Sequence, residues 1–177
     1  MAAQELAQAM QRVQTVLARR PHAGLHDDAP ATVRWSGGTR IVASHANGAE
    51  VLTDMPQELG GSGDQVTPGW LFRAGLASCA ATRIAMAAAS EGIALSSLEL
   101  CASSRSDLLG LLGMAGADGR PVSAAPSDVQ LLVRISAPGV SAQRLRALVE
   151  DSHRLSPVSS ALRDAVPVAL RIEVNGA

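Results

Sequence analysis

The spacing of apolar residues near the N-terminus predicts an amphipathic helix over 3–19, because they recur at intervals of three and four. The positions of this stripe are Leu6, Met10, Val13 and Leu17. Pro21 ends the helix, and the polar stretch after it is typical of a linker. We therefore expect an N-terminal helix and linker over 1–30 and a single domain over 31–177. The stripe can dock on that domain or against a partner chain.

After the linker the apolar period shortens, and three short segments rich in β-branched residues come next. They span 31–37, 39–45 and 49–54. Gly37-Gly38 separates the first two, and Asn47-Gly48 is typical of a two-residue hairpin turn before the third. We expect three consecutive strands here, and then a glycine-rich loop.

A long apolar stretch with helix signals at both ends comes next. Thr67 is a good N-cap, Pro68 suits the first helical position, and Gly92 suits the C-terminal stop. Small residues recur inside it at every fourth position, namely Ala77, Ala81, Ala85 and Ala89. Such a side allows another helix to approach closely, and nearly all other sides are apolar. The pattern predicts a central, buried helix.

The second half of the chain contains three segments in which apolar residues alternate, as they do in strands. These segments are 96–107, 128–137 and 166–174. Ser141 caps a predicted helix that ends before Ser156-Pro157, and a short helical turn comes after it. Without regular βαβ alternation, the fold class is α+β with a mostly antiparallel sheet and helices on one face. The irregular, apolar segment 108–127 is typical of a functional loop or an interface.

Composition narrows the classes of function. Hydrophobic residues make up 47% and charged residues 18% of the chain, as in globular proteins. A net charge of −1 provides no field for nucleic acid or an anionic membrane, and three aromatic residues argue against base stacking. All 15 basic residues are arginine, so Schiff-base chemistry and P-loop phosphate binding are excluded.

Two cysteines are too few for a disulfide scaffold or a structural zinc site, and the four histidines lack ligand spacing. We therefore expect neither a metal nor a cofactor. The first residues lack the apolar core of a signal peptide, and Arg73 and Arg83 interrupt the longest apolar run. We expect a protein without membrane spans, located in the reducing cytoplasm.

Cys79, in the first half of the long predicted helix, is the main candidate for chemistry. Arg83 lies one turn later on the same face, where a cation favours the reactive thiolate. The alternative is a compact buried filler, because free cysteine is among the most buried residue types. Cys101, on a strand face shared with Glu99, is interpreted as an inert thiol.

Asp151, His153 and Ser156 suggest a hydrolase only if their spacing is ignored. Ser156 directly precedes Pro157, and a serine at such a position is most simply an N-cap for the next helical turn.

The run DMPQELGGSGDQVTPGWLFRAGLASCAATRIAMAAASEGIALSSLEL resembles the OsmC/Ohr family of osmotically induced and organic-hydroperoxide-resistance proteins. The family's hallmark is a proline-glycine loop before a long helix that carries a cysteine among small residues. HRLSPVSSAL is similar to its second cysteine motif, and the resemblance covers roughly residues 31 to 174. The N-terminal helix resembles that of an OsmC-like subgroup.

The resemblance implies an intertwined homodimer, with sheets wrapped around long central helices from both chains. It also implies reduction of organic hydroperoxides by a thiolate, which a second cysteine and an external thiol then restore. The peroxidatic cysteine corresponds to Cys79, and the activating arginine to Arg40, with Arg34 as a poorer match. The family's glutamate is replaced by Gly69, and its resolving cysteine by Ser156.

These residues leave three hypotheses open. The first is a weak, one-cysteine, thiol-dependent reductase of hydrophobic hydroperoxides, active in oxidative stress defence. The second is a non-enzymatic homodimer that binds a small hydrophobic ligand in the apolar pocket that would otherwise take the hydroperoxide. The third is a structural or partner-binding domain that uses the loop 108–127 as its contact surface.

Overall fold

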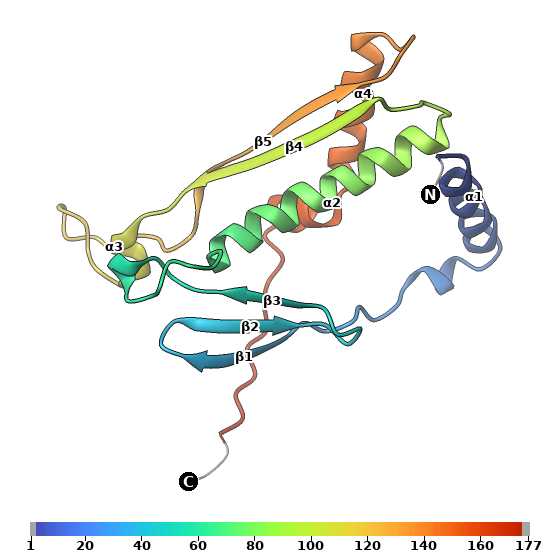
Figure 1. Ribbon diagram of the computed structural model, residues 1–177. Coiled ribbons are helices and arrows are strands. Elements are labelled where there is room, and N and C mark those ends of the chain that lie inside the picture. Colours follow the sequence, from blue (N-terminus) through green and yellow to red (C-terminus); the bar gives the residue numbers. More distant parts are fainter. Residues whose placement is uncertain (1–2, 175–177) are drawn as a thin grey trace.

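The computed structural model describes residues 3–174 and shows a mixed α+β fold built around one long helix (Figure 1). That helix, α2 (Pro68–Ser90), runs between a three-stranded sheet and a strand pair. The predicted fold class is confirmed, although the strands form two antiparallel sheets rather than one. No helix in the described part of the chain is long and apolar enough to cross a membrane.

Helix α1 (Ala3–Arg19) confirms the predicted N-terminal helix. It packs against the C-terminal end of α2, where the Ser90 hydroxyl donates a hydrogen bond to the Met10 sulfur at 3.3 Å. Val13 and Val16, in its second half, are more than half exposed. The apolar stripe is therefore covered by the domain over only part of its length. A short 3₁₀ turn, η1 (Pro21–Gly24), and an exposed linker connect α1 to the first strand.

The three-stranded sheet is an antiparallel meander of β1 (Thr32–Gly37), β2 (Arg40–Ser44) and β3 (Glu50–Thr53). The expected two-residue turn before β3 is wrong. Three residues separate His45 from Ala49, whose carbonyl accepts a hydrogen bond from the His45 amide at 2.9 Å. Gly48 has a φ of +89°, so this is a longer turn closed by a left-handed glycine.

The ends of α2 agree with the sequence signals. The Thr67 hydroxyl accepts a hydrogen bond from the Trp70 amide at 3.2 Å, and Gly92 adopts a φ of +68°. The buried stripe of the helix lies one residue away from the expected alanine stripe. It consists of Leu76, Ala80, Ile84 and Ala88. Of the predicted stripe only Ala89 is buried, whereas Ala77, Ala81 and Ala85 are half-buried.

A long strand pair and two helices cover α2. Strand β4 (Ser97–Arg105) pairs with β5 (Ser127–Ser136), and the predicted alternation is confirmed. Helix α4 (Ala142–Arg154) packs along α2, where Ile84, Ala88, Leu145 and Leu148 form the buried core. Helix α5 (Pro157–Arg163) begins after a sharp bend, and the short α3 (Leu108–Leu111) begins the loop after β4.

The last predicted strand, 166–174, is wrong for this structure: the segment forms no strand. Its alternating apolar side chains are all at least 60% exposed, namely Val166, Val168, Leu170, Ile172 and Val174. A strand needs a neighbouring strand to bond to its backbone groups, and the described residues offer this segment none.

The loop between β3 and α2, which includes the 3₁₀ turn η2 (Gln57–Leu59), is held by Asp54, a carboxylate only 3% exposed. The carboxylate accepts hydrogen bonds from the Ser62 hydroxyl at 2.6 Å, the Thr39 hydroxyl at 2.5 Å and the Met55 amide at 2.8 Å. The Ser62 amide and Arg40 also donate to it. These donors, above all Ser62, hold the pKa of Asp54 well below its usual range.

We predict that Asp54 makes the fold sensitive to acid. The pKa of Asp54 is lower in the folded protein than in the unfolded chain, where it is about 3.9. The ionised carboxylate therefore stabilises the fold at a pH above about 3.9, and this stabilisation is lost as the pH falls below that value. Urea unfolding measured between pH 3 and 7 should show that the free energy of unfolding falls toward pH 3. At that pH, Asp54 should take up nearly one proton when the chain unfolds. Asp54→Asn should be less stable at pH 7 and should lose this acid dependence. Asp28→Asn, at a carboxylate 98% exposed, is the control; equal pH profiles for wild type and Asp54→Asn would contradict the prediction.

Candidate functional site

Cys79 and Ser156, which lie 77 positions apart in the sequence, are in contact. The Ser156 hydroxyl donates a hydrogen bond to the Cys79 sulfur at 3.3 Å. Cys79 is half-buried on α2, and Ser156 is fully buried at the bend between α4 and α5. Ser156 occupies the expected N-cap position, but its side chain makes no capping hydrogen bond. The hydroxyl therefore serves the thiol rather than the helix end.

The local sequence explains why Ser156 lies there. Pro157 cannot continue α4 and suits the first position of α5, so the chain bends at Leu155 and Ser156. Because Leu148 packs on α2 and Ser156 reaches Cys79, α4 runs antiparallel to α2.

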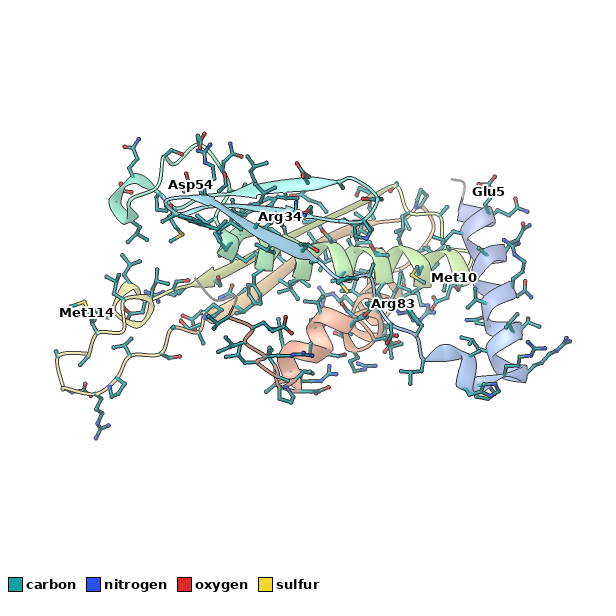
Figure 2. All side chains as sticks on the ribbon, turned by 90° about the horizontal axis from the view of Figure 1, so that it is seen from below. Glu5, Met10, Arg34, Asp54, Arg83 and Met114 are labelled. Carbon is teal, nitrogen blue, oxygen red and sulfur yellow. The ribbon has the colours of Figure 1, made fainter. Side chains whose placement is uncertain are left out.

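Several buried polar atoms near this contact lack a hydrogen-bond partner among the described residues. They are Nη1 of Arg83, Oγ of Ser152 and Oγ of Ser159. Arg83 lies one turn beyond Cys79 on α2, as the sequence spacing indicated, and Figure 2 shows it on the side of α4 and α5. Ser152 is 1% and Ser159 5% exposed. Neither serine was predicted from the sequence; the signal that could have found each one is a polar residue within the apolar stripe of its helix.

Arg40 forms its contacts away from the thiol. Its guanidinium donates to Asp64 at 2.6 Å, to Ser62 at 2.7 Å and to Asp54 at 3.3 Å. The bond to Asp64 is the main reason that the pKa of Arg40 is raised. The pKa of Asp64 is lowered, mainly by the Ser62 hydroxyl and then by Arg40. The structure brings together Cys79 and Ser156 and records no hydrogen bond between Arg40 and Cys79.

Arg34 and Gly69, the other two positions that the resemblance singled out, lie on β1 and in the first turn of α2. Arg34 is exposed on β1, and Figure 2 shows it on the three-stranded sheet together with Asp54. Gly69 lies in the first turn of α2, where an added Cβ would lie 3.7 Å from Nη1 of Arg73. A carboxylate at position 69 would therefore meet Arg73, which here donates to the Ser104 hydroxyl at 3.3 Å.

A cavity of about 740 Å³ lies between α2, β5, α4 and α5. Its α2 wall is the stripe Phe72, Leu76, Ala80 and Ile84, and polar groups enter only from α4 and α5, namely Glu150, His153, Ser159 and Arg163. Cys79 does not line the cavity, although Ala80 next to it does. Its volume and apolar lining are typical of small-molecule sites.

The remaining candidates do not assemble into a site. Cys101 is exposed on β4 opposite Leu132. Asp151 pairs with Arg154 while Ser156 bonds the thiol, so no hydrolase triad forms. In the described residues, no group of three histidine, cysteine, aspartate or glutamate side chains could hold a metal ion.

Comparison with known proteins supports the resemblance. A family model described as "OsmC-like protein" matches residues 61–171. A search of curated protein sequences gave no significant match. Among solved structures, an organic hydroperoxide resistance protein OsmC from Legionella pneumophila matches with a TM-score of 0.55 at 22% identity, over 78% of this chain and 92% of that one.

Two further solved structures share the fold. An OsmC-like protein from Mycoplasma pneumoniae matches with a TM-score of 0.64 at 14% identity, over 78% of this chain and 89% of its own. An OsmC-like protein of unknown function from Vibrio cholerae matches with a TM-score of 0.61 at 16% identity, over 77% of this chain and 94% of its own. Because the family model covers more than half of the sequence, the chain belongs to the OsmC-like protein family.

Proposed function

We propose that this protein is a thiol-dependent reductase of organic hydroperoxides that works with one cysteine, Cys79. The contact between the Ser156 hydroxyl and the Cys79 sulfur carries the proposal. A hydroxyl donor favours the negatively charged thiolate, which is the nucleophile. The name of the Legionella pneumophila relative, an organic hydroperoxide resistance protein, supports this substrate class.

The reaction we propose needs only the thiolate and the hydroperoxide for its first step. The Cys79 sulfur attacks the terminal oxygen of R–O–O–H, a sulfur–oxygen bond forms and the oxygen–oxygen bond breaks. The electron pair of the broken bond leaves on RO⁻, which takes up a proton and departs as the alcohol. Cys79 is thereby oxidised by two electrons to a sulfenic acid, and the hydroperoxide is reduced.

Ser156 determines how the sulfenic acid is reduced in the second half of the proposed cycle. A serine cannot condense with the sulfenic acid to form a disulfide, so an external thiol must do so, with release of water. A second thiol of the same reductant then frees Cys79 and becomes part of a disulfide. This cycle requires a reducing compartment, which is why we place the protein in the cytoplasm. Turnover is expected to be slow, because an unresolved sulfenic acid is open to further oxidation.

The apolar cavity favours a second candidate function, non-enzymatic binding of a small hydrophobic ligand. Its wall on α2 is continuous and apolar, and Cys79 lies outside it. A ligand there needs no thiol chemistry. The two functions differ in whether Cys79 reacts in the folded protein.

We also propose that the protein is a homodimer, because one face of the three-stranded sheet exposes three large apolar side chains. Val33, Trp35 and Val51 share this face by the strand register and are 58%, 74% and 43% exposed. The apolar segment 166–174 also lacks a strand partner within the chain. A second copy can supply both the cover and the strand partner, since each copy carries the same exposed elements.

The first prediction from the proposed function tests the reaction of Cys79 with a hydroperoxide. A Cys101→Ser protein treated with one equivalent of cumene hydroperoxide and dimedone should gain about one dimedone adduct per chain. The adduct should lie on Cys79, and mass spectrometry of peptides locates it. Cys79→Ser is the blank. If Cys79 stays unmodified while alkylating reagents reach it only after unfolding, the ligand-binding function is favoured instead.

The second prediction concerns the position of Ser156. Because its hydroxyl lies 3.3 Å from the Cys79 sulfur, Ser156→Cys should form an intramolecular disulfide with Cys79 after one equivalent of hydroperoxide. Turnover with a dithiol should nevertheless stay low, because the resemblance implies a glutamate that helps to activate the thiolate, and Gly69 replaces it. Ser159→Cys is the matched control, because Ser159 is a buried serine of α5 that makes no bond to the thiol. Sulfenic acid on Cys79 without a disulfide in Ser156→Cys would contradict the placement.

The third prediction tests the dimer. Light scattering at micromolar concentration should give twice the 18.1 kDa mass of one chain. Val33→Asp should shift the protein toward the monomer, because it places a charge on the apolar face of the sheet. Arg34→Asp, at the neighbouring position on the opposite face, is the control and should not. A monomeric wild type would remove the dimer from the proposal.

A further inference from the structure

A thiolate at Cys79 needs positive charge nearby, and Arg40 is not free to supply it. Its guanidinium bonds to the carboxylates of Asp54 and Asp64. This cluster of one cation and two anions has a net negative charge, so it does not favour a thiolate. Within this chain, a different cation must serve if the proposed reaction is correct.

Arg83 has the position for this role. It lies four residues after Cys79 on α2, so the two side chains share a helix face with Cβ atoms about 5–6 Å apart. Helical side chains lean toward the N-terminus, which directs the Arg83 stem toward the turn of Cys79. Its Nη1 is buried and has no hydrogen-bond partner among the described residues. Buried donors are normally bonded, so this nitrogen lacks an acceptor.

Helix α4, which packs along α2, also carries a buried polar group without a hydrogen-bond partner among the described residues. Because α4 runs antiparallel to α2, Ser152 lies one turn before Ser156, opposite the turn of α2 that carries Arg83. Ser152 is 1% exposed, and its hydroxyl has no partner in the described part of the chain. One buried donor of α2 and one buried hydroxyl of α4 thus lack a partner about one turn from the contact between Cys79 and Ser156. Negative charge on Cys79 would complement them.

The other charges on the elements packed against α2 do not replace Arg83. On α4 and α5 every charged or titratable side chain is exposed, namely Arg144, Arg146, Glu150, Asp151, His153, Arg154 and Arg163. Glu99 and Arg105 of β4 are exposed and pair with β5 residues. The charged groups of α1 are exposed as well. Water screens exposed charges strongly, whereas Arg83 is half-buried.

We propose that Arg83, rather than Arg40, is the positioning residue that favours the thiolate of Cys79. The proposal rests on the proposed function and names the group that activates its nucleophile. Arg83 acts through the sulfur and need not touch the hydroperoxide.

The test measures the alkylation rate of Cys79 by iodoacetamide between pH 5 and 10, in a Cys101→Ser background. Arg83→Gln should raise the pH of half-maximal reactivity by about one unit, which is about tenfold less thiolate below that pH. Arg83→Lys retains the charge and should keep the profile of the parent. Arg73→Gln removes another half-buried arginine of α2 and should leave the profile unchanged.

An unchanged profile in folded Arg83→Gln would overturn the proposal, and so would a shift of equal size in Arg40→Gln. If Arg83→Gln does not fold, Arg83→Met, which keeps an apolar stem of similar length, must show the same rise. The alkylation profile requires no hydroperoxide. An Arg83-dependent profile on a thiol that hydroperoxide does not oxidise would therefore reject the proposed function while retaining the role of Arg83.

Discussion

The packing of α4 along α2 is the constraint on which the candidate site depends. Leu145 and Leu148 meet Ile84 and Ala88 in the buried core, and this contact fixes the direction of α4. The bend at Ser156 then falls beside Cys79, 77 positions earlier in the chain. Apolar side chains far from the sulfur thus determine which polar group it meets, because a packed core allows few alternative helix positions.

The arginines on the two sides of α2 differ in whether they are paired with carboxylates. On the side of the three-stranded sheet, Arg40 is neutralised by Asp54 and Asp64, and this cluster holds the loop that leads into the helix. On the side of α4, Arg83 keeps a buried nitrogen that has no partner among the described residues. A guanidinium held by two carboxylates stabilises the fold, whereas a buried guanidinium nitrogen without an acceptor is available to an anion. The resemblance pointed to Arg40, whereas we propose Arg83, because two carboxylates already bind Arg40.

The homodimer that we propose rests on apolar surface that the described residues leave exposed. The face of the sheet that carries Trp35 and the alternating segment 166–174 both have patterns suited to burial. Within the described residues, Val33, Trp35 and Val51 of that face stay exposed, and so do the apolar side chains of 166–174. A sheet of three strands needs packing on its apolar face to be stable, and a strand needs a neighbour for its backbone groups. The homodimer we propose would satisfy both requirements.

The sequence by itself determined the elements whose signals are local. The caps at Thr67 and Ser141, the stop at Gly92 and the alternation in β4 and β5 depend on neighbouring residues, and all were predicted. Family membership and the choice of Cys79 as candidate also came from sequence. Only the tertiary structure decided that Ser156 bonds the sulfur instead of capping α5, that Arg40 pairs with two carboxylates, and that 166–174 lacks a strand partner among the described residues. These outcomes depend on contacts between residues distant in the sequence, and no local pattern encodes which partners the folded chain brings together.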